Sequence, residues 1–127
     1  MAIVSLSLPD QMLESMDEIQ KSVGFSGRSE LVRAAIRLML EETREKDSMT
    51  GPTSAVLVVT HDKDDEERVT RIKHKNEDIV RTHVHSKVNQ QDCVELFLVQ
   101  GDARTVVSMS KAFQRDKRVR NVRLVAI

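Results

Sequence analysis

The stretch Ile3-Val4-Ser5-Leu6-Ser7-Leu8, followed at once by Pro9-Asp10, decides how the first part of this chain folds. Its apolar and small polar residues alternate, which is the period-two pattern of a half-buried strand. Pro9 and Asp10 then favour the start of a helix, because proline is tolerated in a first helical turn. The sequence therefore predicts a short strand that leads directly into a helix.

Two helices are predicted behind this strand. The first ends at Gly24, a residue type that is common just beyond a helix end. A second start signal at 26–30 precedes an amphipathic stretch with Leu31, Val32, Ala35, Ile36, Met39 and Leu40 on one stripe. One strand cannot form a sheet alone, and a module of under about 50 residues buries little apolar area. We therefore expect two chains to pair their strands in an antiparallel ribbon and to fold as a homodimer.

A break in composition separates this module from the rest of the chain. Gly51-Pro52 and the small polar residues before it are typical of a linker, which we place at residues 48–53. The predicted domains are therefore 1–47 and 54–127. The chain has no net charge, yet residues 1–47 hold six Lys and Arg against nine Asp and Glu, and the remainder holds fourteen against eleven.

The second module alternates strands and helices in the order βαββαβ. The expected strands are 55–60, 78–88, 93–99 and 119–127, with helices at 64–73 and after Asp102. This order predicts a ferredoxin-like α+β domain whose helices cover one face of the sheet. The other face is free to pair with another chain.

Composition excludes several classes of protein. Aromatic residues make up 2% of the chain, which disfavours a platform that stacks single-stranded nucleic acid. The single cysteine excludes an intramolecular disulfide. The strand-like alternation at the start leads us to expect no signal peptide, and no apolar run approaches the roughly 20 residues that span a bilayer, so we expect a cytoplasmic protein without a membrane partner. The sequence shows no Ser-His-Asp set, phosphate-binding loop or carboxylate pair that would indicate an enzyme.

The paired strands of the first module are suited to DNA. The inner residues Val4, Leu6 and Leu8 would face the helices, and a two-stranded ribbon fits the major groove of double-stranded DNA. The outward residues and the start of the second helix, which offers backbone N–H groups to a phosphate, supply the candidate contacts: Ile3, Ser5, Ser7, Arg28 and Ser29. The alternative is a dimerisation module only, because its net charge is acidic.

Possible metal ligands gather in the second module. His83, His85 and Lys87 alternate along one strand and so share a face, and we expect Val80, Thr82, Val84 and Val88 to face the helices instead. His74 ends the preceding helix, and Cys93 opens the next strand. Imidazole and thiolate suit nickel, copper, zinc or cobalt. We expect His61 to be a solvated residue or a support for the ligands, and Lys87 to pair with Glu95.

The two modules together resemble the nickel-responsive regulators (NikR), which join a ribbon-helix-helix domain to an ACT-type βαββαβ domain. The likeness rests on the alternating strand, the Leu-Pro-Asp turn, the Gly-Phe-Ser-Gly-Arg-Ser-Glu turn and the segment Asp92-Cys93-Val94-Glu95 before Gly101-Asp102. It covers nearly the whole chain. It implies a homotetramer whose regulatory domains form the centre.

The family's ligand pattern, H-x10-H-x-H-x5-C, falls on His74, His85, Lys87 and Cys93. Three of these positions match, and the resemblance implies that His74 acts across a subunit interface. Lys87 departs from the pattern, because an ammonium group has no lone pair for a metal. His83 lies two residues too early to match, but it could supply the missing imidazole from the same face of the strand.

Other positions also depart from the family. Glu30 matches one acidic residue of the family's alkali-cation site, but Ala34 stands where the family has Asp. Ile3 stands where many members carry Arg, so we expect a different operator. Glu95 is expected to support the metal ligands from behind.

The leading hypothesis is a metal-responsive transcription regulator that binds operator DNA, with nickel as cofactor and copper, zinc or cobalt left open. The alternative is a regulator of the same architecture that has lost its metal site through Lys87 or answers to a small molecule. Whether the regulator activates or represses is left open. A metal-storage or trafficking protein of this shape, or a metal enzyme, is a weaker hypothesis.

Overall fold

The computed structural model describes all 127 residues, which divide into two compact units, Met1–Asp47 and Ser48–Ile127. The first unit contains α1 (Asp10–Val23) and most of α2 (Arg28–Ser48). Gly24, with a φ of +92°, ends α1 in the left-handed conformation that glycine adopts without strain. Residues 1–9 belong to no helix or strand within one chain, because the expected ribbon strand has no partner there.

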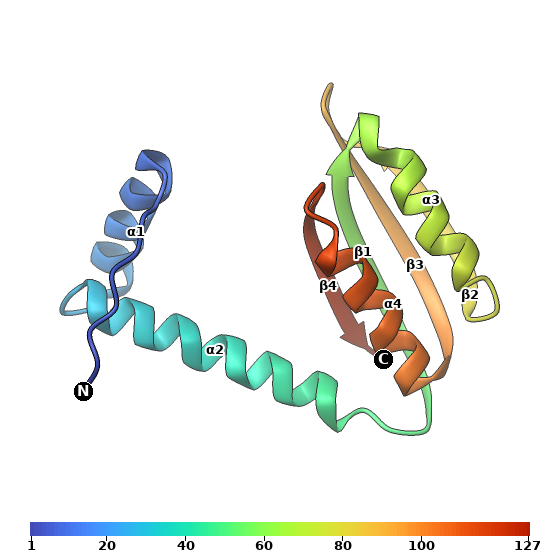
Figure 1. The fold of residues 1–127 in the computed structure, drawn as a ribbon, viewed down its shortest axis with the longest axis horizontal. Helices are drawn as coiled ribbons and strands as arrows, with labels where there is room; N and C mark the ends of the chain where they lie inside the picture. Colours follow the sequence, from blue (N-terminus) through green and yellow to red (C-terminus); the bar gives the residue numbers. More distant parts are fainter. The chain divides into compact units, whose positions relative to one another are not determined.

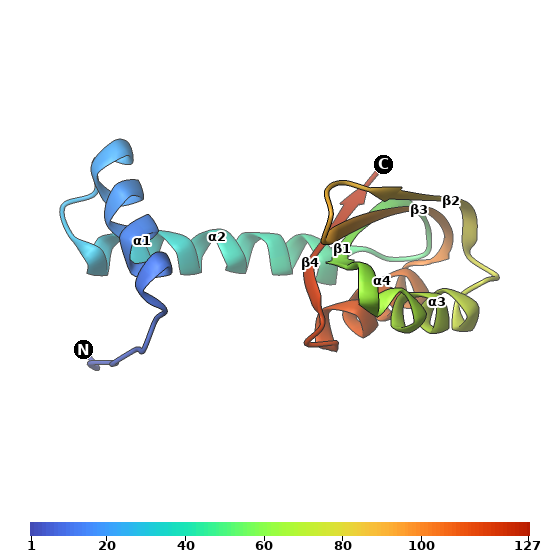
Figure 2. The same cartoon turned by 90° about the horizontal axis from the view of Figure 1, so that it is seen from above.

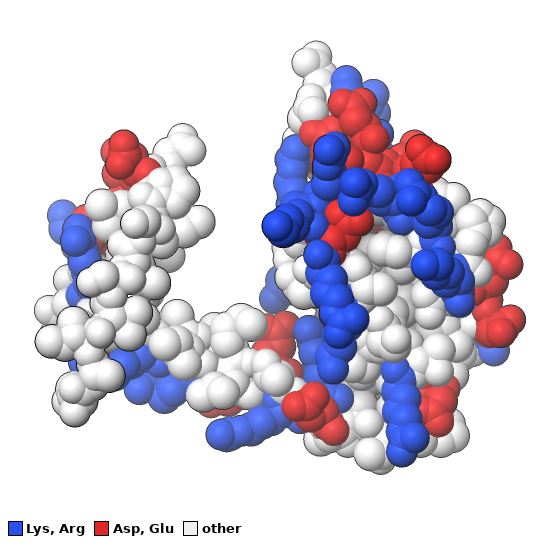
Figure 3. Space-filling model, viewed as in Figure 1, with Lys and Arg blue, Asp and Glu red and all other residues white.

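The first unit leaves its apolar side chains uncovered. Neither α1 nor α2 contains a buried residue. A groove of about 550 Å³ runs between them and is lined almost entirely by apolar side chains from residues 1–9 and both helices, among them Leu6, Leu8, Met16, Ile19, Ile36 and Met39. The white surface of this unit in Figure 3 carries few charged side chains. A surface of this kind requires a partner to exclude water.

The second unit is a four-stranded antiparallel sheet with two helices on one face (Figures 1 and 2). Its elements are β1 (Pro52–Asp62), a 3-10 turn (Lys63–Asp65), α3 (Glu66–Lys75), β2 (Val80–Lys87), β3 (Asp92–Asp102), α4 (Ala103–Arg115) and β4 (Val119–Ala126). The strand order is β2-β3-β1-β4, which is the predicted ferredoxin-like arrangement. The helix expected at 64–73 begins two residues later because a 3-10 turn precedes it, and β1 is longer at both ends than predicted.

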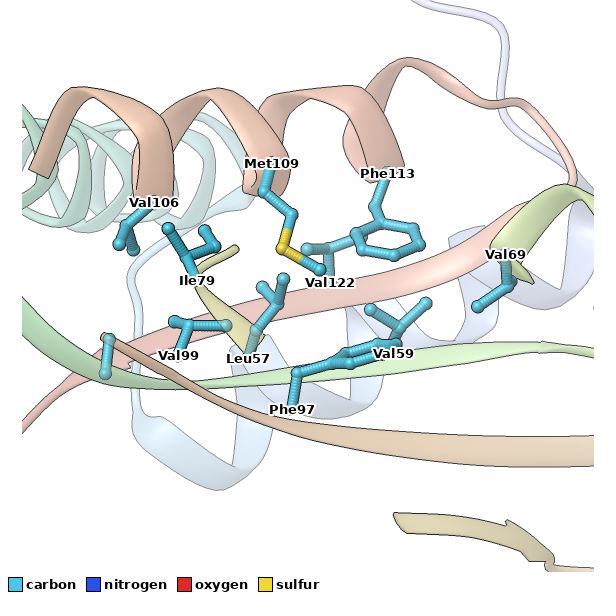
Figure 4. Close-up of a cluster of buried hydrophobic side chains, with 11 residues drawn as sticks. Leu57, Val59, Val69, Ile79, Phe97, Val99, Val106, Met109, Phe113 and Val122 are labelled. Atoms are coloured by element: carbon cyan, nitrogen blue, oxygen red, sulfur yellow. The ribbon is translucent and has the colours of Figure 1, made fainter. Parts of the chain in front are cut away.

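The core lies between the sheet and its helices (Figure 4). Leu57 and Val59 of β1 and Phe97 and Val99 of β3 alternate inward, as period-two strands require. They pack against Val69 of α3 and Val106, Met109 and Phe113 of α4. Gly101 passes so close to Ile79 that a Cβ there would lie 2.5 Å from the isoleucine Cγ2, so only glycine fits.

The orientation of β2 differs from the sequence-based expectation. Val84 is 49% exposed and Val88 is 60% exposed, so neither faces the helices. His83 instead stacks on the fully buried Phe97, with ring centroids 4.5 Å apart. Of the four residues expected to face the helices, only Val80 packs against the hydrophobic core, because the register of β2 against β3 shifts between Val80 and Thr82. The face with His83, His85 and Lys87 is therefore the one that the helices cover.

Candidate metal centre and nucleic-acid interface

The candidate metal residues lie on three successive cross-strand rows of the sheet. The antiparallel register pairs Lys87 with Cys93 and Cys93 with His61 in the first row. It pairs His85 with Glu95 in the second row and His83 with Phe97 in the third. Paired residues of an antiparallel sheet project from the same face. These rows therefore bring histidines from two strands toward one carboxylate between them.

Glu95 is the centre of this arrangement. Three of the chain's four histidines approach its carboxylate. His61 Nε2 lies 2.8 Å from Oε2, while His83 Nε2 and His85 Nδ1 lie 2.7 Å and 3.1 Å from Oε1. Glu95 is 3% exposed, so the imidazoles supply the polar contacts that water would otherwise make. We call His61, His83, His85 and Glu95 the histidine cluster.

His61 is the most enclosed member of the histidine cluster. It is fully buried, which contradicts the first of the two expectations, a solvated residue or a support for the ligands. Its Nδ1 lies 2.7 Å from the backbone carbonyl oxygen of Asp62. A carbonyl can only accept, so Nδ1 carries a proton and donates it there. This contact fixes the tautomer and leaves Nε2 directed at Glu95.

Asp62 is itself held in place at the end of β1. Its side chain accepts from the backbone N–H of Asp64 at 2.9 Å and contacts Gln91 and Arg120. These contacts keep the pKa of the Asp62 carboxyl below its ordinary value of 3.8, with the Asp64 hydrogen bond as the largest cause. The backbone that orients His61 is therefore anchored from two sides.

The cluster has the composition and spacing of a metal site. One ligand atom each from His61, His85 and Glu95 lies within 4.8 Å of the other two. The rings of His61 and His85 are 6.1 Å apart between centroids. Glu66 of α3 lies 3.7 Å from His85 Nδ1, at the more exposed side of the cluster. Two imidazoles and a carboxylate form a ligand set that divalent transition metals accept.

The ligand set implied by the family pattern is only partly assembled within one chain. Cys93 is buried beside His61, but its sulfur is not among the atoms that converge. Lys87 lies opposite Cys93 on β2 and forms no ion pair with Glu95. His74 lies near the end of α3, where it is largely exposed and contacts Glu77 at 2.6 Å. His74 could therefore join a site only from another subunit.

The alternation of β1 could have revealed His61. Ala55, Leu57 and Val59 occupy inward positions, and His61 continues the same series. A polar residue at a core position of a strand needs a polar partner. That partner, Glu95, comes from β3, and only the strand register identifies it.

The candidate DNA-binding residues lie in the first unit. Ile3 is 96% exposed, and neither it, Ser5 nor Ser7 lines the apolar groove, whereas Leu6 and Leu8 do. Arg28 begins α2 and forms two 3.0 Å hydrogen bonds with Asp17 of α1. This hydrogen bonding lowers the pKa of Asp17 below its ordinary 3.8. Ser29 follows in the first turn of α2.

The acidic site expected from the family on α2 is reduced to one carboxylate. Glu30 is engaged by the guanidinium of Arg33, whose Nε lies 3.1 Å from Oε1. Ala34, one turn further along α2, offers no ligand atom. This arrangement does not favour an alkali cation here.

No helix is both long and apolar enough to cross a membrane.

Comparisons with known proteins assign both units. The NikR C-terminal nickel-binding domain family matches residues 54–127, and the ribbon-helix-helix (CopG) family matches residues 2–43. These matches confirm an N-terminal ribbon-helix-helix domain followed by an ACT-like regulatory domain, and they indicate a transcription regulator rather than an enzyme.

Two similar relatives carry the name "Putative nickel-responsive regulator". One, from Halobacterium salinarum, is 33% identical over 109 residues, which cover 84% of this chain and 77% of the relative. The other, from Methanococcus maripaludis, is 30% identical over 127 residues, 98% of this chain and 90% of the relative. An uncharacterized Thermotoga maritima protein shares the fold over 61% of this chain and 99% of its own length, with a TM-score of 0.56 and 15% identity. The chain belongs to the family of nickel-responsive ribbon-helix-helix regulators.

Proposed function

We propose that the chain is a nickel-responsive transcription regulator in which metal binding in the regulatory domain changes the affinity of the first domain for operator DNA. The observation that carries this proposal is the convergence of three imidazoles on one buried carboxylate, in a chain that also carries a ribbon-helix-helix domain. His85 is the one ligand shared by the family pattern and the histidine cluster. A bound divalent ion would supply positive charge that joins side chains from separate elements.

DNA would be read by a ribbon formed from two chains. Leu6 and Leu8 line the groove of the first unit, so pairing of two strands would direct Ile3, Ser5 and Ser7 outward. Short hydroxyl groups can donate to or accept from base edges, and Ile3 can contact a thymine methyl. Arg28 and Ser29, at the N-terminus of α2, would bind the phosphate backbone and fix the register of the ribbon.

The sheet of the regulatory domain offers a second surface for assembly. Val84, Leu96 and Val125 are between 40% and 56% exposed on the face that no helix covers. A face of this kind favours packing against another chain, which supports a homotetramer of two ribbon dimers. In such an assembly, metal would shift the population toward arrangements in which both ribbons reach their half-sites.

The second candidate is a regulator of the same architecture that does not respond to metal. Lys87 favours it, because a cationic side chain takes the place of a ligand in the family pattern. The two candidates differ in one measurable property, namely whether metal changes DNA affinity.

The test is selection of duplex DNA from a random pool by the full chain, once with Ni²⁺ and once with a chelator. Affinity for the selected DNA is then measured by fluorescence anisotropy at fixed salt, because phosphate contacts make affinity strongly salt-dependent. We expect Ni²⁺ to tighten binding by about 5-fold or more, the lower end of usual allosteric coupling. Equal affinity in both conditions would favour the second candidate, and no selected DNA would reject both.

A further inference from the structure

His61 and Glu95 meet in a contact that requires a proton or a metal ion between them. The Nδ1 proton of His61 is committed to the carbonyl of Asp62, so a neutral ring presents a lone pair at Nε2. That lone pair would face the Glu95 carboxylate at 2.8 Å, in a place where His61 is fully buried and Glu95 is 3% exposed. Two electron-rich atoms cannot stay in this contact in a medium of low polarity. Either a proton or a metal ion must lie between them.

We infer that this chain holds a divalent metal ion inside one subunit, bound by His61 Nε2, His85 Nδ1 and a Glu95 carboxylate oxygen. This site shares only His85 with the ligand set implied by the family pattern, and it uses neither Cys93 nor His74. When the ion binds, the proton between His61 and Glu95 leaves to solvent. The inference rests on the proposed metal dependence, but it concerns the ligands alone.

The residues around the site hold its ligands in position. The Asp62 carbonyl accepts from His61 Nδ1, which is the usual arrangement behind a metal-bound histidine. His83 Nε2, 2.7 Å from Glu95 Oε1, can donate to the carboxylate and fix its orientation. His85 is about a third exposed, so its ring can carry its proton on Nε2 and keep Nδ1 for the ion. Glu66 or water is left to complete the coordination.

The alternative set is weakened at two positions. Lys87 brings a cation to the place of one ligand. The sulfur of Cys93 does not join the converging atoms. The three atoms of the inferred site, in contrast, already lie within 4.8 Å of one another without any partner chain.

The ligand types define the class of ion. Two imidazoles and one carboxylate suit Ni²⁺, Zn²⁺, Co²⁺ and Cu²⁺, and the absence of thiolate removes the preference for softer ions such as Cu⁺. Nickel is the ion indicated by the family, and zinc provides a second probe with well-defined bond lengths.

The first test is X-ray absorption spectroscopy of the reduced full-length wild-type protein loaded with Ni²⁺ or, separately, Zn²⁺ at one ion per chain. We expect a shell of nitrogen and oxygen only, at about 2.0–2.1 Å for zinc, without the sulfur shell near 2.3 Å that a cysteine would give. This measurement needs no mutant and so does not depend on the folding of a variant. A sulfur shell would overturn the inference.

The second test compares metal affinity in matched single variants of the full chain, measured by calorimetric titration with Ni²⁺. His61→Gln should weaken binding by more than about 100-fold, beyond the 10–100-fold that loss of an outer supporting residue causes. Cys93→Ala and His74→Gln, the controls from the alternative set, should bind within a few-fold of wild type. Circular dichroism of each variant checks that the fold is kept.

The reverse pattern, in which Cys93→Ala weakens Ni²⁺ binding and His61→Gln leaves it unchanged, would reject the inferred site. It would leave the proposal of a nickel-responsive regulator intact. Stoichiometric binding that depends on His61 but leaves DNA affinity unchanged would support the site and reject the proposed function. Failure of wild type to bind Ni²⁺ or Zn²⁺ would reject both.

Discussion

A single buried carboxylate organises the chemistry of the regulatory domain. Glu95 lies within hydrogen-bond distance of three imidazoles that come from β1 and β2. Burial of a charged group is costly unless it is paired and hydrogen-bonded, and here the pairing is complete. The residue that the sequence suggested as a support for the ligands is therefore the group on which the histidines depend.

Replacement of Glu95 tests this dependence without metal. Glu95→Leu should lower the free energy of unfolding of the metal-free regulatory domain by about 1–3 kcal/mol, because it leaves the buried Nε2 of His61 without a hydrogen-bond partner. Glu95→Gln should cost less, because the amide can donate to a neutral His61 Nε2. Scanning calorimetry of the full chain measures both changes. Negligible losses in both variants would show that the carboxylate contributes only its volume.

At this scale the sequence predicted residue types better than their environments. His83 and His85 were predicted to share a face from their spacing alone, and the structure places both against Glu95. The sequence left His61 open as a solvated residue or a support for the ligands, because its partner is 34 residues away and is determined by strand register. Spacing along one strand carries no information about which strand lies next to it.

At the scale of elements, the helices and strands of the regulatory domain followed from the pattern of apolar residues. The side of β2 that faces the helices did not, because Val84 and His85 alternate equally well in either orientation. Pairing with β3 decides it. Since Phe97 must enter the core, its cross-strand partner His83 must face the same way.

The turn from α4 to β4 contains Asp116, whose ion pair with Arg68 allows a test of pH-dependent stability. Asp116 accepts from the backbone N–H of Arg118 at 3.0 Å and from Arg68 at 3.3 Å, and its side chain is 14% exposed. The Arg118 hydrogen bond is the largest cause that holds the pKa of Asp116 below its ordinary 3.8. A lowered pKa stabilises the fold above the ordinary value, and this contribution is lost as pH falls through the folded pKa.

Asp116→Asn should therefore lower the stability of the regulatory domain by about 1 kcal/mol at neutral pH. The difference from wild type should shrink below pH 3.8, as the wild-type carboxylate becomes protonated. Thermal unfolding followed by circular dichroism at a series of pH values measures it. A difference that is constant with pH would contradict the assigned role of the charge.

Two neighbouring residues before α1 allow a test with matched variants. Leu6 lines the apolar groove and the adjacent Ser7 does not. Leu6→Asp should therefore abolish ribbon pairing, because it places a charge in the apolar interface. Ser7→Asp should leave the assembly unchanged and weaken DNA binding through repulsion from phosphates. Sedimentation velocity and DNA anisotropy separate the two effects, and loss of assembly in both variants would contradict the assigned faces.

At the scale of the whole molecule, the chain joins a domain that needs a partner to a domain with its own core. The first unit has no buried residue in either helix, whereas the second packs its sheet against two helices. The order of the domains was predictable from the composition break near residue 50, and so was the need for dimerisation. The histidine cluster was not predictable in full, because it forms only when β1, β2 and β3 are aligned.

We propose that metal occupancy of the histidine cluster controls DNA binding. A variant that loses metal binding but keeps DNA binding, or the reverse, would separate the two domains functionally. Because coupling between sites is reciprocal, DNA should also raise the affinity of the chain for Ni²⁺.

The most direct test is a Ni²⁺ titration of DNA affinity at fixed salt, followed by fluorescence anisotropy, for wild type, His61→Gln and Cys93→Ala. We expect Ni²⁺ to tighten DNA binding by about 5-fold or more in wild type and Cys93→Ala but to have no effect in His61→Gln. A wild-type DNA affinity that is the same with and without Ni²⁺ would contradict the proposed coupling.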